Sequence, residues 1–220
     1  MLTVELVNEN IPRLQLQDSV IKAKQLISDF KLTHLPIVSE NTFLGLISEE
    51  DLLDVEDEKI PIELIQKSFV LGFVYDDVHF LNAVNFCNQY ETNIVPVLNK
   101  SNEFLGVITS SHLLKNMGDF AGGNEIGGLI ILEMERIQFS ISEISRIVES
   151  NDCTILHLNT MTNPLNGVLM VTLHLNKREI SSVVSTFDRY EYTIKHHFGN
   201  QEFESNTQIN YKNLIKYLDI

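Results

Sequence analysis

The apolar positions of the first 120 residues follow one order twice. Apolar residues spaced three and four apart predict an amphipathic helix that begins after Asp18 or Ser19, either of which suits the N-cap. These positions are Val20, Ala23, Ile27 and Phe30. Two short apolar runs, "LPIV" (35–38) and "FLGLI" (43–47), then predict strands on either side of the polar "SENT". The second copy repeats this order as "FLNAVNFCNQY", "IVPVL" and "FLGVI".

The two copies are offset by a nearly constant distance. Pro36 recurs 60 residues later as Pro96, and Gly45 recurs 61 residues later as Gly106, after one inserted loop residue. An internal duplication explains this offset. Each copy predicts a β-α-β-β-α unit that ends in a Gly-x-x-Ser/Thr turn and a second helix. The predicted repeats span 1–58 and 59–120.

A different pattern follows the second copy. The glycine-rich "GDFAGGNEIGG" predicts a linker at 121–127. In residues 128–199 the apolar positions follow the two-residue period of a strand or the 3.6-residue period of a helix, in the order strand, helix, strand, strand, helix, strand. The first of these helices carries a capping box of Ser140 and Glu143, and Asn166-Gly167 marks the tip of the hairpin between the middle strands. This βαββαβ order predicts a ferredoxin-like domain, so the whole chain is α+β. The apolar positions of "YKNLIKYLDI" predict a short helix within the tail 200–220.

Composition narrows the class of partner. A net charge of −14 and a sequence pI near 4.8 would repel a phosphate backbone, so we expect no nucleic-acid partner. No apolar run approaches the roughly 18 residues of a membrane span, and the N-terminus has no export signal, so we expect no membrane partner. Cys87 and Cys153 form no C-x-x-C pair and predict buried, reduced thiols. These features together predict a cytoplasmic protein.

The repeated strand-to-helix turn is the main candidate for chemistry. In "GLISEED", Ser48 can cap the exposed N–H groups of the following helix, with Asp51 in its first turn, and this interpretation needs no ligand. Alternatively, the N–H groups and the hydroxyl seat a phosphate while the carboxylate accepts both hydroxyls of a ribose. Thr109 stands at the same place in the second copy, as the second interpretation requires.

These motifs resemble those of tandem cystathionine-β-synthase (CBS) domains over about residues 1–118. The resemblance rests on "HLPIV" with "FLGLISEEDLL" and on "NIVPVL" with "FLGVITSSHLL". It implies that a CBS pair, or Bateman module, holds an adenosine ligand at a Gly-x-x-Ser/Thr-x-x-Asp motif, with the hydroxyl near phosphate and the carboxylate on the ribose. The implied nucleotide-binding residues are Ser48, Asp51, His34, Gly45, Thr109 and His112.

His112 departs from the motif, because the second copy has this histidine where the first has Asp51. A neutral imidazole has one acceptor nitrogen and cannot clamp two hydroxyls as a carboxylate does. The loss of a charge-assisted hydrogen bond costs on the order of 1.5 to 3 kcal/mol. We therefore predict that the second site is weaker, altered or vestigial.

The C-terminal unit resembles an ACT domain, a ferredoxin-like module that often binds amino acids beside its first strand. The family's usual Asp and Gly are absent from the corresponding loop, "ERIQFSISE", so the resemblance implies dimer formation rather than amino-acid binding. The order of CBS pair and ACT-like domain is similar to that of small bacterial regulatory proteins of the acetoin-utilisation type.

Other candidate sites have simpler explanations. His157 and His174 face each other if the hairpin turns near residue 165, which pairs 157 with about 173, but a metal would need a third ligand. The acidic "SEEDLLDVEDEK" is typical of a solvated helix end. The chain has no nucleophile and base pair, P-loop or Rossmann fingerprint, so we expect no enzyme, no catalytic residue and no metal.

Two functional hypotheses remain. In the first, the protein is a ligand sensor and homodimer that binds AMP, ADP, ATP, S-adenosylmethionine, NAD or a cyclic dinucleotide and signals to an unknown protein target. In the second, it is a constitutive dimeric interaction module without a ligand.

Overall fold

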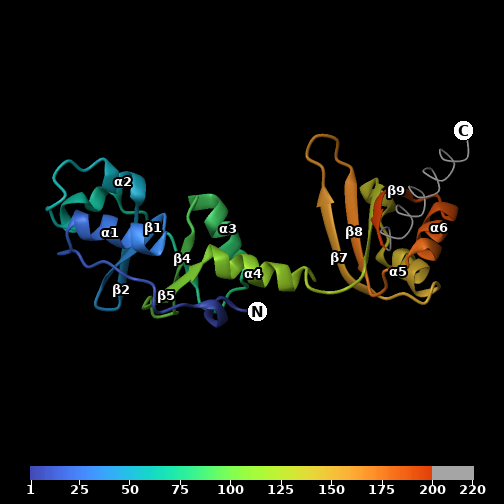
Figure 1. Cartoon of the computed structure of the whole chain (residues 1–220), viewed down its shortest axis with the longest axis horizontal. Coiled ribbons are helices and arrows are strands. Elements are labelled where there is room, and N and C mark those ends of the chain that lie inside the picture. Colours follow the sequence, from blue (N-terminus) through green and yellow to red (C-terminus); the bar gives the residue numbers. More distant parts are fainter. Residues whose placement is uncertain (200–220) are drawn as a thin grey trace, which may run out of the picture. The chain divides into compact units, whose positions relative to one another are not determined.

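The computed structural model describes residues 1–199, and the predicted tail helix lies outside them. The chain divides into two compact units, Met1–Met117 and a second that begins at Gly118 (Figure 1). Among the described residues, no helix is both long enough and apolar enough to cross a bilayer.

The first repeat forms as its hydrophobic pattern predicts. Ser19, rather than Asp18, caps its first helix and accepts a hydrogen bond from the backbone N–H of Lys22. The expected leading strand is reduced to one parallel bridge between Leu14 and Ile37. The elements are η1 (Thr3–Leu6), α1 (Val20–Phe30), β1 (His34–Ser39), β2 (Thr42–Ser48) and α2 (Glu49–Leu53).

The second repeat has the same order with a complete leading strand. Its sheet has the strand order β3-β4-β5, with β3 parallel to β4 and β4 antiparallel to β5, whereas the first repeat has the antiparallel pair β1-β2. The elements are η2 (Ile62–Ser68), β3 (Val74–Tyr75), α3 (Leu81–Tyr90), β4 (Ile94–Leu98), β5 (Phe104–Thr109) and α4 (Ser110–Phe120).

The leading segment of each repeat also pairs with the other repeat. Asn8, in the leading segment of the first repeat, forms an antiparallel bridge with Val107 of β5, and Val70, in that of the second, forms one with Leu46 of β2. Beside these bridges the chain passes very close to Gly106, where an added Cβ would lie 2.7 Å from Val7 Cγ1 and 2.9 Å from Asn8 O. The φ of +147° at Gly106 also favours glycine, so this position is fixed by backbone geometry.

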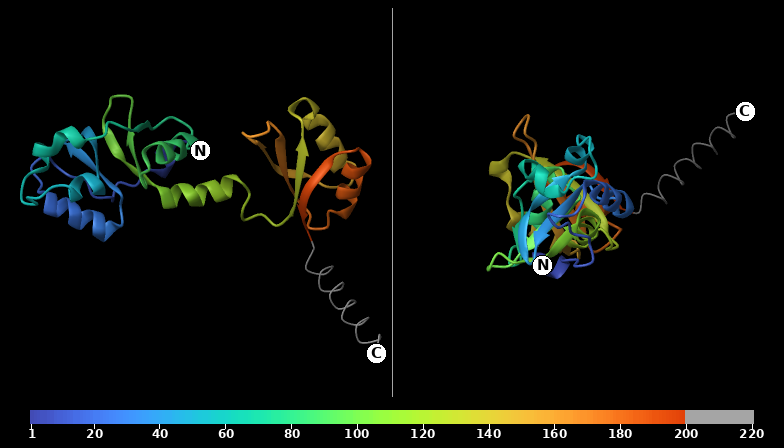
Figure 2. Two further views of the ribbon diagram at one scale, coloured as in Figure 1. Left: turned by 90° about the horizontal axis from the view of Figure 1, so that it is seen from above. Right: turned by 90° about the vertical axis from the view of Figure 1, so that its left-hand side faces the viewer.

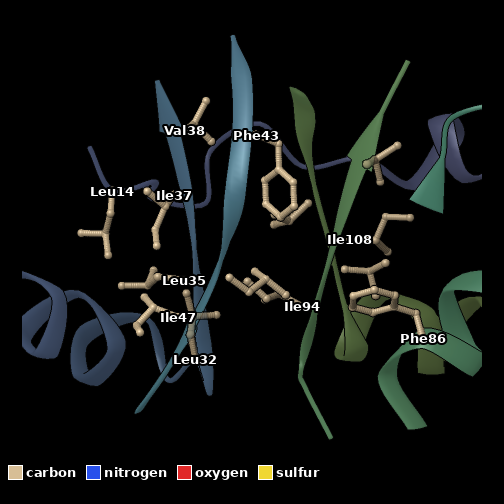
Figure 3. Close-up of a cluster of buried hydrophobic side chains, with 14 of the residues drawn as sticks. Leu14, Leu32, Leu35, Ile37, Val38, Phe43, Ile47, Phe86, Ile94 and Ile108 are labelled. Atoms are coloured by element: carbon tan, nitrogen blue, oxygen red, sulfur yellow. The ribbon is translucent and has the colours of Figure 1, made fainter. Parts of the chain in front are cut away.

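One apolar core joins the two repeats. Figure 3 shows β1-β2 and β4-β5 facing each other with the side chains of Phe43 and Ile94 between them, while Leu35 lies on the other side of β1-β2. The ring of Phe43 also stacks on its counterpart Phe104, with the ring centroids 6.0 Å apart. Burial of this shared apolar area favours the paired arrangement over two separate repeats.

The second unit is ferredoxin-like, as predicted. Its antiparallel sheet has the order β7-β8-β6-β9, and α5 and α6 lie on one side of it (Figures 1 and 2). Alternate residues of β6 and β8 are buried in a core of their own with both helices. The elements are β6 (Gly128–Met134), η3 (Arg136–Gln138), α5 (Ile141–Glu149), β7 (Ile155–Thr162), β8 (Leu169–Leu175), α6 (Ser181–Arg189) and β9 (Thr193–Phe198).

Candidate functional site

The turn from β2 to α2 brings the first pair of candidate residues together. Ser48 Oγ accepts the backbone N–H of Asp51 at 3.0 Å, and its hydroxyl donates to Asp51 Oδ2. Both side chains are half-buried. The hydroxyl therefore caps the helix, while the second carboxylate oxygen of Asp51 has no hydrogen bond within the described residues.

His34 lies beside this turn, because the β1-β2 register places it opposite Ser48. Its Nδ1 lies 2.9 Å from Thr33 Oγ1. Burial lowers the pKa of His34, and the carboxylates of Asp51 and Glu50 oppose this shift only in part. The imidazole is therefore neutral at pH 7 and offers one donor and one acceptor.

The second repeat keeps the cap and loses the other groups. Thr109 Oγ1 accepts the backbone N–H of His112 at 3.3 Å, which is the same bond that Ser48 makes in the first repeat. The position opposite Thr109 is the buried Ile94, where the first repeat has His34. The two turns are thus alike in backbone and different in side-chain chemistry.

A polar contact between equivalent residues of the two repeats links the two turns. Asn93 Oδ1 accepts the backbone N–H of Thr33 at 2.9 Å, and Thr33 Oγ1 accepts the backbone N–H of Asn93 at 3.0 Å. These residues are equivalents, 60 apart. Their carbonyls in turn accept the first N–H groups of α2 and α4, from Glu49 and Ser110, each at 2.8 Å. Both residues lie outside the Gly-x-x-Ser/Thr motif, and only the 60-residue offset marks them in the sequence as equivalents.

Gly45 has a structural reason for its identity. Its φ is +148°, and an added Cβ would lie 2.9 Å from Phe69 Cβ and 3.3 Å from Val70 O. This glycine admits the crossing segment, as Gly106 does in the second repeat. Its predicted place in a ligand site stays a prediction.

A polar cavity of about 330 Å³ lies in the second unit, at the loop where the ACT resemblance would place an amino acid. Lys195 Nζ lies 2.7 Å from Glu133 Oε2, and the Tyr192 hydroxyl donates to Glu143 Oε2 at 3.1 Å. Burial and the Glu143 carboxylate raise the pKa of Tyr192 to about 12. Among the described residues the lining contains carboxylates but no lysine or arginine; it consists of Glu133, Met134, Gln138, Glu143, Tyr190, Glu191, Tyr192 and Thr193.

The two strand histidines do meet. His157 pairs with His174 rather than with residue 173, because the hairpin is centred between residues 165 and 166, and the ring centroids lie 6.0 Å apart. His157 Nε2 also lies 3.3 Å from Glu125 Oε1. Within residues 1–199, no group of three or more His, Cys, Asp or Glu side chains is arranged to hold a metal ion.

The first unit is thus an internally duplicated α+β module with two equivalent strand-to-helix turns joined by a shared polar contact. Residues 4–58 match the family model described as CBS domain. The second repeat has the same order of elements, the same capped turn and the same crossing segment. The match to the CBS domain thus covers the first repeat, and the second repeat shares its architecture.

Several proteins are similar to this chain at low sequence identity. A homoserine O-acetyltransferase of Methanocorpusculum labreanum is 28% identical over 116 residues, which are 51% of this chain and 23% of that protein. The chain therefore spans less than a quarter of that relative's length.

Solved structures with partial similarity include a CBS domain pair/ACT domain protein from Thermotoga maritima, at 16% identity and a TM-score of 0.49 over 55% of this chain and 98% of that one. A protein assigned to acetoin utilization in Vibrio cholerae is 18% identical, with a TM-score of 0.46 over 55% of this chain and 92% of that one. CBSX2 in complex with AMP is 17% identical to this chain, with a TM-score of 0.46 over 54% of this chain and 97% of that one. At these TM-scores the similarities add nothing to the fold described above.

Proposed function

We propose that this protein is a regulatory sensor whose CBS pair binds an adenosine-containing compound at the first repeat. Ser48, Asp51 and His34 would form the main site, and Gly45 would let the chain pass closely behind it. Thr109 and His112 would form a weaker second site.

The observation that carries the proposal is the carboxylate of Asp51. Capping alone requires only a hydroxyl, since Thr109 caps the 11-residue α4 without any carboxylate at the equivalent position. Asp51 nevertheless holds a half-buried carboxylate with one oxygen unengaged among the described residues, beside a neutral imidazole. A carboxylate of this kind can accept both hydroxyls of a ribose.

The test is a thermal-shift panel of AMP, ADP, ATP, S-adenosylmethionine, NAD and cyclic dinucleotides, followed by calorimetric titration. A ligand at about 100 times its dissociation constant stabilises the folded state by roughly 2.7 kcal/mol, which is visible as a shift in melting temperature. We expect Asp51→Ala to abolish most of that shift.

Asp54→Ala is the matched control, because it removes an exposed carboxylate from the C-cap of the same helix. If Asp51 serves only the helix, Asp51→Ala will lower the ligand-free melting temperature and leave the ligand shift intact. A panel without any shift would instead favour the constitutive interaction module.

We infer that the sensor acts as a cytoplasmic homodimer. Two observations support a second copy over the helices of the first unit: α3 and α4 enclose an apolar hollow of about 180 Å³, and Leu114 at its rim is 74% exposed. Leu53, its equivalent on α2, is 64% exposed. Ligand binding would then change the packing of the dimer and so reach a protein target.

Light scattering tests the dimer. The wild type should be a dimer at micromolar concentration, and Leu53→Glu/Leu114→Glu should dissociate it. A monomeric wild type would contradict this part of the proposal.

A further inference from the structure

The segments that follow the two capped turns differ sharply in charge. Directly after Ser48 the chain reads "EEDLLDVEDE", and directly after Thr109 it reads "SSHLLKNMGD". Seven of the first ten residues are carboxylates, against one of the second ten, which also include Lys115. Three of the seven, Glu49, Glu50 and Asp51, lie in the first turn of α2, whereas the first turn of α4 has no acidic residue, so the first turn is anionic at the first site and not at the second.

The side chains around the first site do not compensate for this charge. Glu49 and Glu50 are exposed in the first turn of α2, beside Ser48. Burial lowers the pKa of His34, so its ring adds no positive charge at pH 7.

The lysines of the preceding helix, α1, add little positive charge to offset these carboxylates. On α1, Lys22 already pairs with Asp18 at 2.6 Å and Lys24 with Glu58 at 2.7 Å. Lys31, the C-cap of α1, is exposed and makes no ion pair within the described residues.

This charge distribution constrains the ligand, on the basis of the function proposed above. If Asp51 holds the 2′ and 3′ hydroxyls, the 5′ substituent lies within the width of one sugar ring from the first turn of α2. A phosphate there carries a charge of about −1.5 to −2 at pH 7 and would face Glu49 and Glu50. We propose that the first repeat selects adenosine compounds with a neutral or positively charged 5′ substituent over those with a 5′-phosphate.

Two matched ligand pairs test this inference by calorimetry on the full chain. Adenosine and AMP differ by the phosphate, and S-adenosylmethionine and S-adenosylhomocysteine differ by one methyl group and one positive charge. Binding that disappears in Asp51→Ala is assigned to the first repeat. We expect adenosine to bind about tenfold more tightly than AMP there, and S-adenosylmethionine more tightly than S-adenosylhomocysteine.

A charge-neutralising variant tests whether Glu49 and Glu50 cause the selection against a 5′-phosphate. Glu49→Gln/Glu50→Gln should raise AMP affinity by about tenfold and leave adenosine affinity unchanged. The control is Glu40→Gln/Glu103→Gln, which removes the same charge at the hairpin turns, the opposite end from the His34–Ser48 pair. Added salt should strengthen AMP binding and weaken S-adenosylmethionine binding, because screening reduces repulsion and attraction alike.

The outcomes separate this inference from the proposed function. If AMP binds in an Asp51-dependent manner as tightly as adenosine, the charge selection is wrong and the proposed function stands. If Glu49→Gln/Glu50→Gln leaves the ratio of AMP to adenosine affinity unchanged, the two glutamates are not its cause. If no adenosine compound shows Asp51-dependent binding, both proposals fail.

Discussion

Removal of the Asn93 side chain should loosen the contact between the two repeats of the first unit. This side chain accepts hydrogen bonds from the N–H and the hydroxyl of Thr33 at 2.9 and 3.1 Å and donates one to the carbonyl of Lys31 at 2.9 Å. A typical hydrogen bond contributes about 0.5–1.5 kcal/mol, so Asn93→Ala should destabilise the first unit by about 3 kcal/mol. For a unit of this size that loss lowers the melting temperature by roughly 12 °C.

Asn99→Ala is the control. Asn99 also makes three hydrogen bonds, to Ser101 and Glu103, but within one exposed turn, where water replaces them. We expect it to cost less than about 1 kcal/mol. The assay is differential scanning calorimetry of the full chain, and a double-mutant cycle with Thr33→Ala should give a coupling of about 1–2 kcal/mol. If Asn93→Ala costs no more than Asn99→Ala, the contact does not hold the repeats together.

Three further outcomes are expected. His112→Asp should place a carboxylate behind Thr109 and raise the stoichiometry or affinity of adenosine-ligand binding in calorimetry, and an unchanged titration would contradict its role in the second site. Gly106→Ala should destabilise the first unit by about 2–4 kcal/mol in denaturant titrations, because its Cβ would lie 2.7 Å from Val7 Cγ1, whereas Gly118→Ala, with no atom within 4 Å, should be neutral or slightly stabilising. Calorimetry of the full chain should detect no micromolar binding of standard amino acids, because the cavity of the second unit would set carboxylates against the ligand's own carboxylate; micromolar affinity for any of them would refute this.

Hydrophobic periodicity was sufficient to predict both architectures. The run from residue 128 to 198 alternates between periods of two and 3.6, and the strands and helices of the second unit follow it. The capping hydroxyls of Ser48 and Ser140 could also be predicted, because a cap is a local interaction between neighbours in sequence.

Features that depend on distant residues could not be predicted in this way. The short leading strand of the first repeat is a single bridge at Leu14, which no local pattern distinguishes from the full β3. The Thr33–Asn93 contact joins polar residues that look like ordinary turn positions in sequence. The pairing of His157 with His174 depends on the exact centre of the hairpin, between residues 165 and 166, which the sequence of the turn does not fix.

The candidate site likewise combines features that neighbours in sequence determine with features that depend on distant residues. Ser48 and Asp51 could be identified from their spacing, since three residues bring a cap and the first turn of a helix together. The position of His34 opposite Ser48 depends on strand register, and the lowered pKa of its ring depends on burial. Gly45 of the motif is also required because the backbone of the crossing segment lies against it, which the motif alone does not reveal.

The crossing segments have a consequence for how this unit could be divided. Asn8 lies in the leading segment of the first repeat yet pairs with the second, and Val70 lies in that of the second yet pairs with the first. This reciprocal exchange is the topology of a domain-swapped dimer whose two halves are covalently joined. Residues 59–120 expressed alone would leave Val70 without Leu46 and Val107 without Asn8. Two such fragments can restore both bridges by exchanging their leading segments, so a single repeat should fold as a swapped pair rather than as a monomer.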